Sequence, residues 1–129
     1  MTTTQQQVEQ IQAACENYTA AHRAYEAADY AWGRLSGEDF KTARGRLNAI
    51  RVAAGRDLRE VCKLNGLTQT CSMADGSGVL TTCEAYASKA LGHVAIWSGF
   101  ATFTPASEVR AKAKANAIRA RVARDSAQY

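Results

Sequence analysis

The chain has 129 residues, a formal net charge of +4, four cysteines and a single proline, and 47% of its residues are hydrophobic. This composition excludes a disordered chain, and the length is enough to bury a core that is stable without metal or disulfide staples. The N-terminus carries neither the basic nor the apolar segment of a signal peptide, and the longest apolar stretch, 91–103, is too short to span a bilayer. We therefore expect one domain, 1–129, in the cytoplasm, with its cysteines reduced.

Residues 4–34 are predicted to form the first helix. Seam residues recur in steps of three and four over four heptads, the spacing that keeps one stripe of a helix against a partner helix. We call this stripe the 8–32 seam and predict that it forms the interface of a homodimer or higher oligomer. The 8–32 seam consists of Val8, Ile11, Cys15, Tyr18, His22, Tyr25, Asp29 and Trp32.

Two positions of the 8–32 seam are polar. His22 and Asp29 are too far apart to touch on one helix, but they could meet between two antiparallel copies. Buried polar seam residues are a known device for fixing register and oligomer state. The other interpretation is that the seam ends in solvent at His22.

A second helix is predicted after a break in the helical pattern at 33–39, where Ser36 and Asp39 form a capping-box pattern. Helical spacing then continues to Asn65-Gly66, a pair that ends helices. The short connection predicts an antiparallel helical hairpin over 1–66. A second basic line follows one side of this helix and consists of Lys41, Arg44, Arg51 and Arg59.

The remaining chain is also predicted to be helical. Residues 67–78 are polar and glycine-bearing, which predicts a loop, and 79–103 are predicted to be a buried helix because their far half is apolar on nearly all sides. Thr104 as N-cap and Pro105 at the first helical position predict a basic C-terminal helix over 104–129. The predicted fold class is therefore all-α, a helical bundle of about four helices with a long N-terminal hairpin and a coiled-coil-like seam.

The C-terminal helix contains the stretch RAKAKANAIRARVAR, 110–124, which has six basic side chains and no acidic one. At 100° per residue, four of them fall within an arc of about 80°, and Lys112 and Arg119 lie nearly opposite. These four are the C-terminal basic stripe: Arg110, Lys114, Arg121 and Arg124. Between the basic edges runs the C-terminal apolar stripe: Ala111, Ala115, Ile118, Val122 and Tyr129.

The basic side chains allow two interpretations. If the C-terminal basic stripe and the second basic line face the same way, they form an electrostatic footprint for phosphate groups or for an acidic protein. No aromatic residue is interleaved with them, so base stacking is not indicated. The alternative is a solvated charged face that keeps an alanine-rich helix soluble.

No pattern of metal ligands or catalytic residues stands out. The cysteines include no Cys-x-x-Cys pair, so zinc is only weakly indicated, and a disulfide among Cys62, Cys71 and Cys83 is a minor alternative. Cys83 and His93 would point to different faces of one predicted helix, which argues against a catalytic pair. We expect no enzyme activity, no metal and no cofactor.

The sequence therefore predicts a non-enzymatic small helical binding protein, an adaptor or inhibitor. It would self-associate and engage an anionic partner surface (nucleic acid, nucleoprotein or acidic protein) through basic helix faces, without binding a membrane. The alternative function is a structural subunit of a homo-oligomeric ring, filament or virion-like assembly, in which ends of opposite charge stack copies. Small helical chains of this kind are also typical of viruses and mobile elements.

Overall fold

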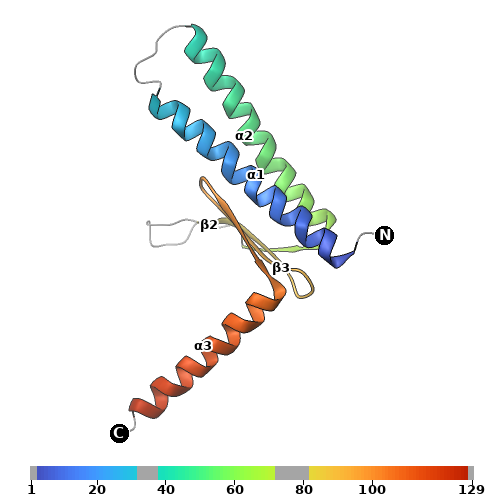
Figure 1. The fold of residues 1–129 in the computed structure, drawn as a ribbon, viewed down its shortest axis with the longest axis vertical. Helices are drawn as coiled ribbons and strands as arrows, with labels where there is room; N and C mark the ends of the chain where they lie inside the picture. The colour runs from blue at the N-terminus through green and yellow to red at the C-terminus, as the bar shows by residue number, and fades with distance from the viewer. Residues whose placement is uncertain (1–2, 32–37, 72–81, 128–129) are drawn as a thin grey trace.

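The computed structural model describes residues 3–31, 38–71 and 82–127 and combines helices with a sheet (Figure 1). The elements follow one another in this order: α1 (Thr4–Ala31), α2 (Glu38–Leu64), β1 (Thr68–Cys71), β2 (Thr82–Ser88), β3 (Gly92–Trp97), β4 (Ala101–Pro105) and α3 (Ala106–Ala127). The predicted all-α helical bundle is therefore wrong. The described residues form an α+β fold with three helices and a four-stranded antiparallel sheet.

Both helices of the predicted hairpin are present, and local signals account for the start of α1 and the end of α2. At the start of α1, the Gln6 N–H donates to Thr3 Oγ1 at 3.2 Å and the Thr3 N–H donates to Gln6 Oε1 at 2.9 Å, a capping box. At the end of α2, Gly66 adopts φ 77° and the Leu67 N–H donates to the Cys62 carbonyl at 2.9 Å. This is a Schellman turn, and it confirms that Asn65-Gly66 ends the helix. The predicted cap at Ser36 lies outside the described residues.

The four strands form a meander in the order β1-β2-β3-β4. A tight turn joins β3 to β4, with Gly99 at φ 107° and the Trp97 N–H donating to the Phe100 carbonyl at 2.8 Å. Gly92 opens β3 at φ 133°, and a Cβ there would lie 2.9 Å from the Ala106 nitrogen. Glycine is therefore required at the point where β3 passes the start of α3.

The helix predicted over 79–103 is the main error of the sequence prediction. Its described part, 82–103, contains β2, β3 and most of β4, and the predicted loop over 67–78 contains β1, with 72–78 outside the described residues. On β3 the large buried side chains Val94 and Ile96 alternate with His93, Ala95 and Trp97, which is the period of a strand. Small apolar residues such as Ala95 occupy the other face, so the stretch is apolar on both faces and resembles a buried helix in sequence.

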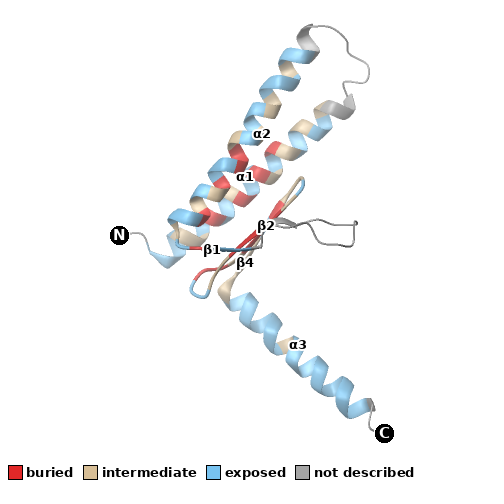
Figure 2. Cartoon of the chain, turned by 180° about the vertical axis from the view of Figure 1, so that it is seen from behind, coloured by how far each residue is buried: buried red, intermediate tan, exposed pale blue. Residues whose placement is uncertain are grey.

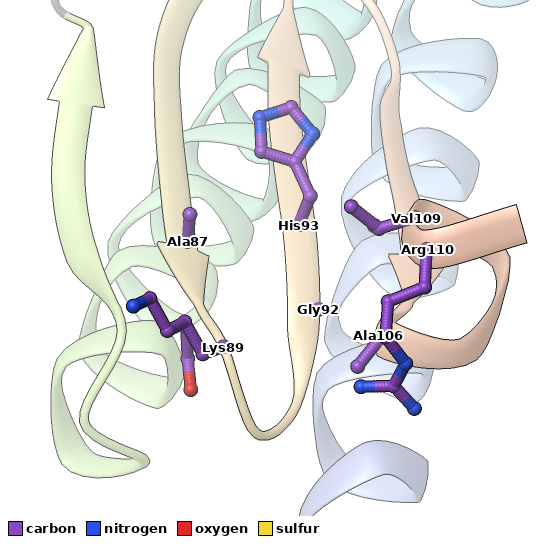
Figure 3. A pocket seen from close by; sticks show the side chains of 8 residues that line it. Ala87, Lys89, Gly92, His93, Ala106, Val109 and Arg110 are labelled. Carbon is purple, nitrogen blue, oxygen red and sulfur yellow. The ribbon is translucent and has the colours of Figure 1, made fainter. Parts of the chain in front are cut away.

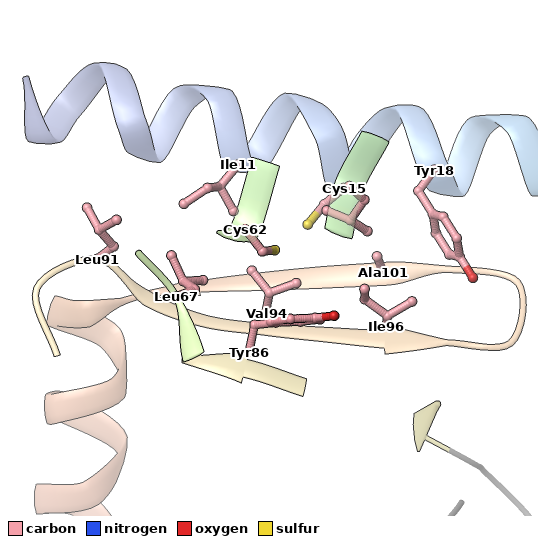
Figure 4. Close-up of a cluster of buried hydrophobic side chains, with 11 residues drawn as sticks. Ile11, Cys15, Tyr18, Cys62, Leu67, Tyr86, Leu91, Val94, Ile96 and Ala101 are labelled. Carbon is pink, nitrogen blue, oxygen red and sulfur yellow. The ribbon is translucent and has the colours of Figure 1, made fainter. Parts of the chain in front are cut away.

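The helical hairpin covers one face of the sheet, and the core lies between them (Figure 4). Tyr86, Val94 and Ile96 point from the strands toward α1. The core cluster consists of Ile11, Cys15, Tyr18, Leu58, Cys62, Leu67, Tyr86, Leu91, Val94, Ile96 and Ala101. We call the hairpin and the sheet together the body. From the body, α3 extends away from the hairpin, and its surface is almost entirely exposed (Figure 2).

Candidate partner-binding site

The direction of α3 is set by its junction with the sheet. Pro105 is the last residue of β4 and is followed at once by the first residue of the helix, so Thr104 and Pro105 lie in the strand and not at the predicted N-cap and first helical position. The Ala106 N–H donates to the Leu91 carbonyl at 3.0 Å. Glu108 lies in the first turn, where the positive end of the helix dipole stabilises a carboxylate. This junction fixes the base of α3 but covers none of its length, since every described side chain from 107 to 126 is exposed except the half-buried Ala115.

The C-terminal basic stripe lies entirely on this projecting helix. Arg110, Lys114, Arg121 and Arg124 are all exposed, as are Lys112 and Arg119. Within the part of the chain that the structure describes, none of these six side chains makes an ion pair or a hydrogen bond. Their positive charge is therefore not neutralised by the body and is available to an external anion.

The second basic line differs from the C-terminal basic stripe, because three of its four side chains contact other residues of the chain. Arg51 stacks over the Tyr25 ring at 4.0 Å from the ring centroid, and the Arg44 Nε–H donates to Tyr25 Oη at 3.2 Å. Arg59 forms an ion pair with Glu84 of β2 at 2.7 Å, and Lys41 remains exposed. Because the hairpin and α3 extend in opposite directions from the sheet (Figure 1), the structure does not bring the two sets of basic residues together into one footprint.

The first half of the 8–32 seam lies in the core of the single chain. Ile11, Cys15 and Tyr18 are 0%, 3% and 5% exposed, packed against the sheet, and Val8 packs beside them. The oligomer interface therefore stays a prediction, and these residues are covered by the sheet and α2 rather than by a second copy. Of the remaining seam residues, the Asp29 side chain and all of Trp32 lie outside the described residues.

The polar middle of the 8–32 seam also has contacts within the chain. His22 is half-buried, with its ring centroid 4.2 Å from that of Tyr18 and its Nδ1 3.0 Å from the Tyr18 carbonyl oxygen. Tyr25 is half-buried beneath Arg51. These contacts account for His22 and Tyr25 without a second chain.

A polar cluster at the edge of the core was not predicted from the sequence. Glu84 accepts hydrogen bonds from Arg59 Nε at 2.7 Å and from Tyr86 Oη at 2.8 Å. Burial, reinforced by the hydrogen bond to Glu84, raises the pKa of Tyr86 to about 12. The signal that could have revealed the cluster is the spacing of Glu84 and Tyr86, since residues two apart share one face of a strand.

Two thiols lie between the hairpin and the sheet (Figure 4). Burial and, secondarily, the neighbouring Cys62 raise the pKa of the Cys15 thiol to about 12. Burial and, secondarily, the charge of Glu84 raise the pKa of Cys62 to about 11. Both thiols are therefore protonated near neutral pH and are poor nucleophiles and poor metal ligands.

A hollow of about 470 Å³ lies where the base of α3 meets the sheet, on the face turned away from the hairpin (Figure 3). Its floor is formed by small residues, among them Ala87 and Gly92, and its walls are almost entirely apolar. Lys89, His93 and Arg110 lie around it, so Arg110 belongs both to this hollow and to the C-terminal basic stripe. The sequence prediction missed Lys89 and His93 here because it placed both within one helix.

Two further features concern metals and membranes. Among the described residues, no group of three His, Cys, Asp or Glu side chains could hold a metal ion. No helix in this part of the chain combines the length and the apolarity needed to cross a membrane.

Comparison with known proteins adds no family to this description. No family model matches the chain, and neither a curated protein nor a solved structure matches it at a significant level. The site is therefore defined by its own geometry: a projecting basic helix, α3, on a body in which three residues of the second basic line, Arg44, Arg51 and Arg59, contact other side chains of the chain.

Proposed function

We propose that this protein is a non-enzymatic binding protein that engages an anionic macromolecular partner through α3. The observation that supports the proposal is the placement of the C-terminal basic stripe on a helix that extends from the body without side-chain partners among the described residues. An alanine-rich helix that packs on nothing is only marginally stable on its own, and a partner that covers it would supply the missing packing.

The exposed apolar residues of α3 favour binding over simple solvation. Ile118 and Val122 are 54% and 57% exposed, and both lie on the C-terminal apolar stripe between the basic edges. A helix whose charges serve only solubility would gain nothing from two exposed β-branched residues, which lower helix propensity and leave apolar surface in water. A partner surface that is anionic and partly apolar would satisfy both features at once.

The division into a body and a projecting helix fits an adaptor or an inhibitor. When α3 binds, the hairpin and the sheet remain outside the contact, so they can bind a second molecule or obstruct access to the first. A structural subunit of a homo-oligomer is the less favoured function, because the residues predicted to join copies, Ile11, Cys15 and Tyr18, are buried in the chain itself. The cytoplasmic location stays a prediction.

The test is affinity capture from an extract of the host cell, with the full chain as bait. Wild-type protein is expected to retain a partner at low salt and to lose it as salt rises, because screening weakens exposed charge pairs. Arg121→Glu with Arg124→Glu should reduce capture at least tenfold. Nuclease treatment shows whether nucleic acid carries the contact.

The matched control also replaces two arginines by glutamate, but on the body instead of on α3. Arg23→Glu with Arg46→Glu reverses two exposed residues of α1 and α2 that belong to neither basic set. This variant should capture the partner as wild type does. Equal loss in both variants would mean that only net charge matters, and no loss in either would refute α3 as the binding element.

A further inference from the structure

The C-terminal apolar stripe has the spacing of a coiled-coil seam. Its described members, Ala111, Ala115, Ile118 and Val122, follow one another in steps of four, three and four residues. This spacing keeps them on one face of α3, where they occupy the two core positions of the heptad repeat. No other described element covers that face, since the contacts of α3 with the sheet are confined to its base (Figure 2).

Both flanks of the stripe are basic. In the heptad set by Ala115 and Val122, the flanking positions on one side are Lys112 and Arg119, and on the other side Lys114 and Arg121. All four side chains are exposed and, among the described residues, have no ion-pair partner. In coiled coils these flanking positions face the partner helix and decide which partner is accepted.

Two copies of α3 would therefore repel each other. In a parallel pair, Lys114 of one helix would face Arg119 of the other, and in an antiparallel pair each flank would face its own copy. Every such contact joins two positive charges, and like charges across an interface are a recognised device against a wrong partner. With two alanines among its four described positions, the stripe has little apolar surface with which to overcome that repulsion.

We infer that α3 pairs with an amphipathic helix of a different protein that presents apolar core positions flanked by glutamate or aspartate on both sides. The inference rests on the proposed function and specifies the partner of the same helix. Acidic flanks would neutralise the four basic positions, and larger apolar side chains on the partner would fill the space over Ala111 and Ala115. The short apolar stripe gives only part of the affinity, so binding should depend strongly on salt.

A duplex nucleic acid fits the same surface less well. Phosphate contacts are made by basic side chains and do not need apolar ones, so Ile118 and Val122 would remain exposed in such a complex. A rigid phosphate backbone also meets one side of a helix at a time, whereas the basic residues of α3 lie on both sides of the apolar stripe. A random-sequence DNA duplex is therefore included in the test as a competing ligand.

The test uses the full chain and a designed peptide of three heptads with leucine at the core positions and glutamate at both flanking positions. Binding is measured by fluorescence anisotropy at low salt, with a peptide carrying lysine at the flanking positions and a random-sequence DNA duplex as comparison ligands. The acidic peptide should bind at least tenfold more tightly than the lysine peptide. Circular dichroism should show added helix on mixing.

Substitutions on α3 separate the apolar from the basic contribution. Ile118→Gln with Val122→Gln should weaken binding of the acidic peptide at least tenfold, and so should Lys112→Glu with Arg119→Glu. The control, Ala113→Gln with Ala120→Gln, lies on the opposite face of α3 and should leave binding unchanged. Glutamine keeps the helix propensity close to that of the residues it replaces.

Three results would overturn the inference. One is that the acidic peptide fails to bind while the capture experiment above still shows loss in the α3 variant; the proposed function would then survive without this partner. Another is that the chain binds duplex DNA more tightly than the acidic peptide, with a DNA affinity that Ile118→Gln with Val122→Gln does not change. The third is a dimer in light scattering that dissociates when Ile118 and Val122 are replaced, which would make a second copy the partner.

Discussion

The helices α1 and α3 are alike in sequence and opposite in environment. Both are rich in alanine, and both carry an apolar stripe in steps of three and four. In α1 the sheet and α2 cover the first half of that stripe, so Ile11 is completely buried and Tyr18 is 5% exposed, whereas in α3 Ile118 is 54% exposed. Alanine allows close packing in the first case and serves only helix formation in the second.

The polar side chains differ in the same way. Three arginines of α2, Arg44, Arg51 and Arg59, contact Tyr25 or Glu84, but the basic residues of α3 have no such contacts among the described residues. Part of the charge of the body is thus engaged within the chain, whereas α3 exposes both its basic side chains and its apolar stripe. An amphipathic pattern therefore shows that a helix has a contact face but not whether the contact lies in the same chain.

The sharpest test of this difference truncates isoleucine in both helices. Ile11→Ala should lower the free energy of unfolding by about 2–5 kcal/mol, because it removes a fully buried side chain and leaves a cavity. Ile118→Ala should change it by no more than about 0.5 kcal/mol, since that side chain is exposed. Urea unfolding followed by tryptophan fluorescence measures both. Similar losses in the two variants would mean that α3 packs on the body after all.

Alkaline pH should destabilise the body, because the three groups with raised pKa values all lie in the body and none lies in α3. Cys15, Cys62 and Tyr86 have pKa values raised to about 12, 11 and 12 from ordinary values of 9.0, 9.0 and 10.0. A group whose pKa is higher in the folded than in the unfolded state gives its full stabilisation below the unfolded value, and that stabilisation is lost as pH rises toward the folded value. The free energy of unfolding should therefore fall between pH 9 and pH 12, by at least about 2 kcal/mol from pH 8 to pH 11.

A cysteine variant identifies the cause of the alkaline effect. Cys15→Ala removes one of the three groups, so its stability should fall less steeply with pH than that of wild type, whatever its stability at pH 8. A slope equal to that of wild type would assign the effect to general charge repulsion instead. Iodoacetamide labelling at pH 8, mapped by mass spectrometry, should also find Cys15 and Cys62 unreactive until the chain unfolds.

Removing most of α3 should have only a small effect on stability. A chain that ends after Ala111 keeps the junction at Ala106 and Val109 and, among the residues whose burial is described, loses only exposed ones and the half-buried Ala115. Its free energy of unfolding should lie within about 1 kcal/mol of the full chain, because the removed segment buries almost no apolar surface. Its far-ultraviolet circular dichroism should lose the signal of one helix. A loss of more than about 2 kcal/mol would contradict the separation of α3 from the body.

Much of the helical structure could be predicted from the sequence, because the signals are local. Two local signals were right: the three-and-four spacing of 4–34 and the Asn65-Gly66 pair, and the structure has helices at Thr4–Ala31, Glu38–Leu64 and Ala106–Ala127. Pro105 marks the start of the third helix only to within one residue, because it ends β4 instead of opening the helix. The basic residues of α3 were likewise evident, since a run of lysine and arginine on an alanine-rich helix is defined by the sequence alone. These features depend on neighbours along the chain.

Only the tertiary structure decided the rest. Ala85 and Ala95 share the sheet with Tyr86 and Val94, and their small size hides the two-residue alternation that would have indicated strands. The sequence also could not show that the sheet covers Ile11 and Tyr18, that Arg59 meets Glu84 across 25 positions, or that α3 remains uncovered. These outcomes depend on which surfaces of distant segments meet and exclude water together, and that choice is made by the free energy of the whole chain rather than by any one stretch of it.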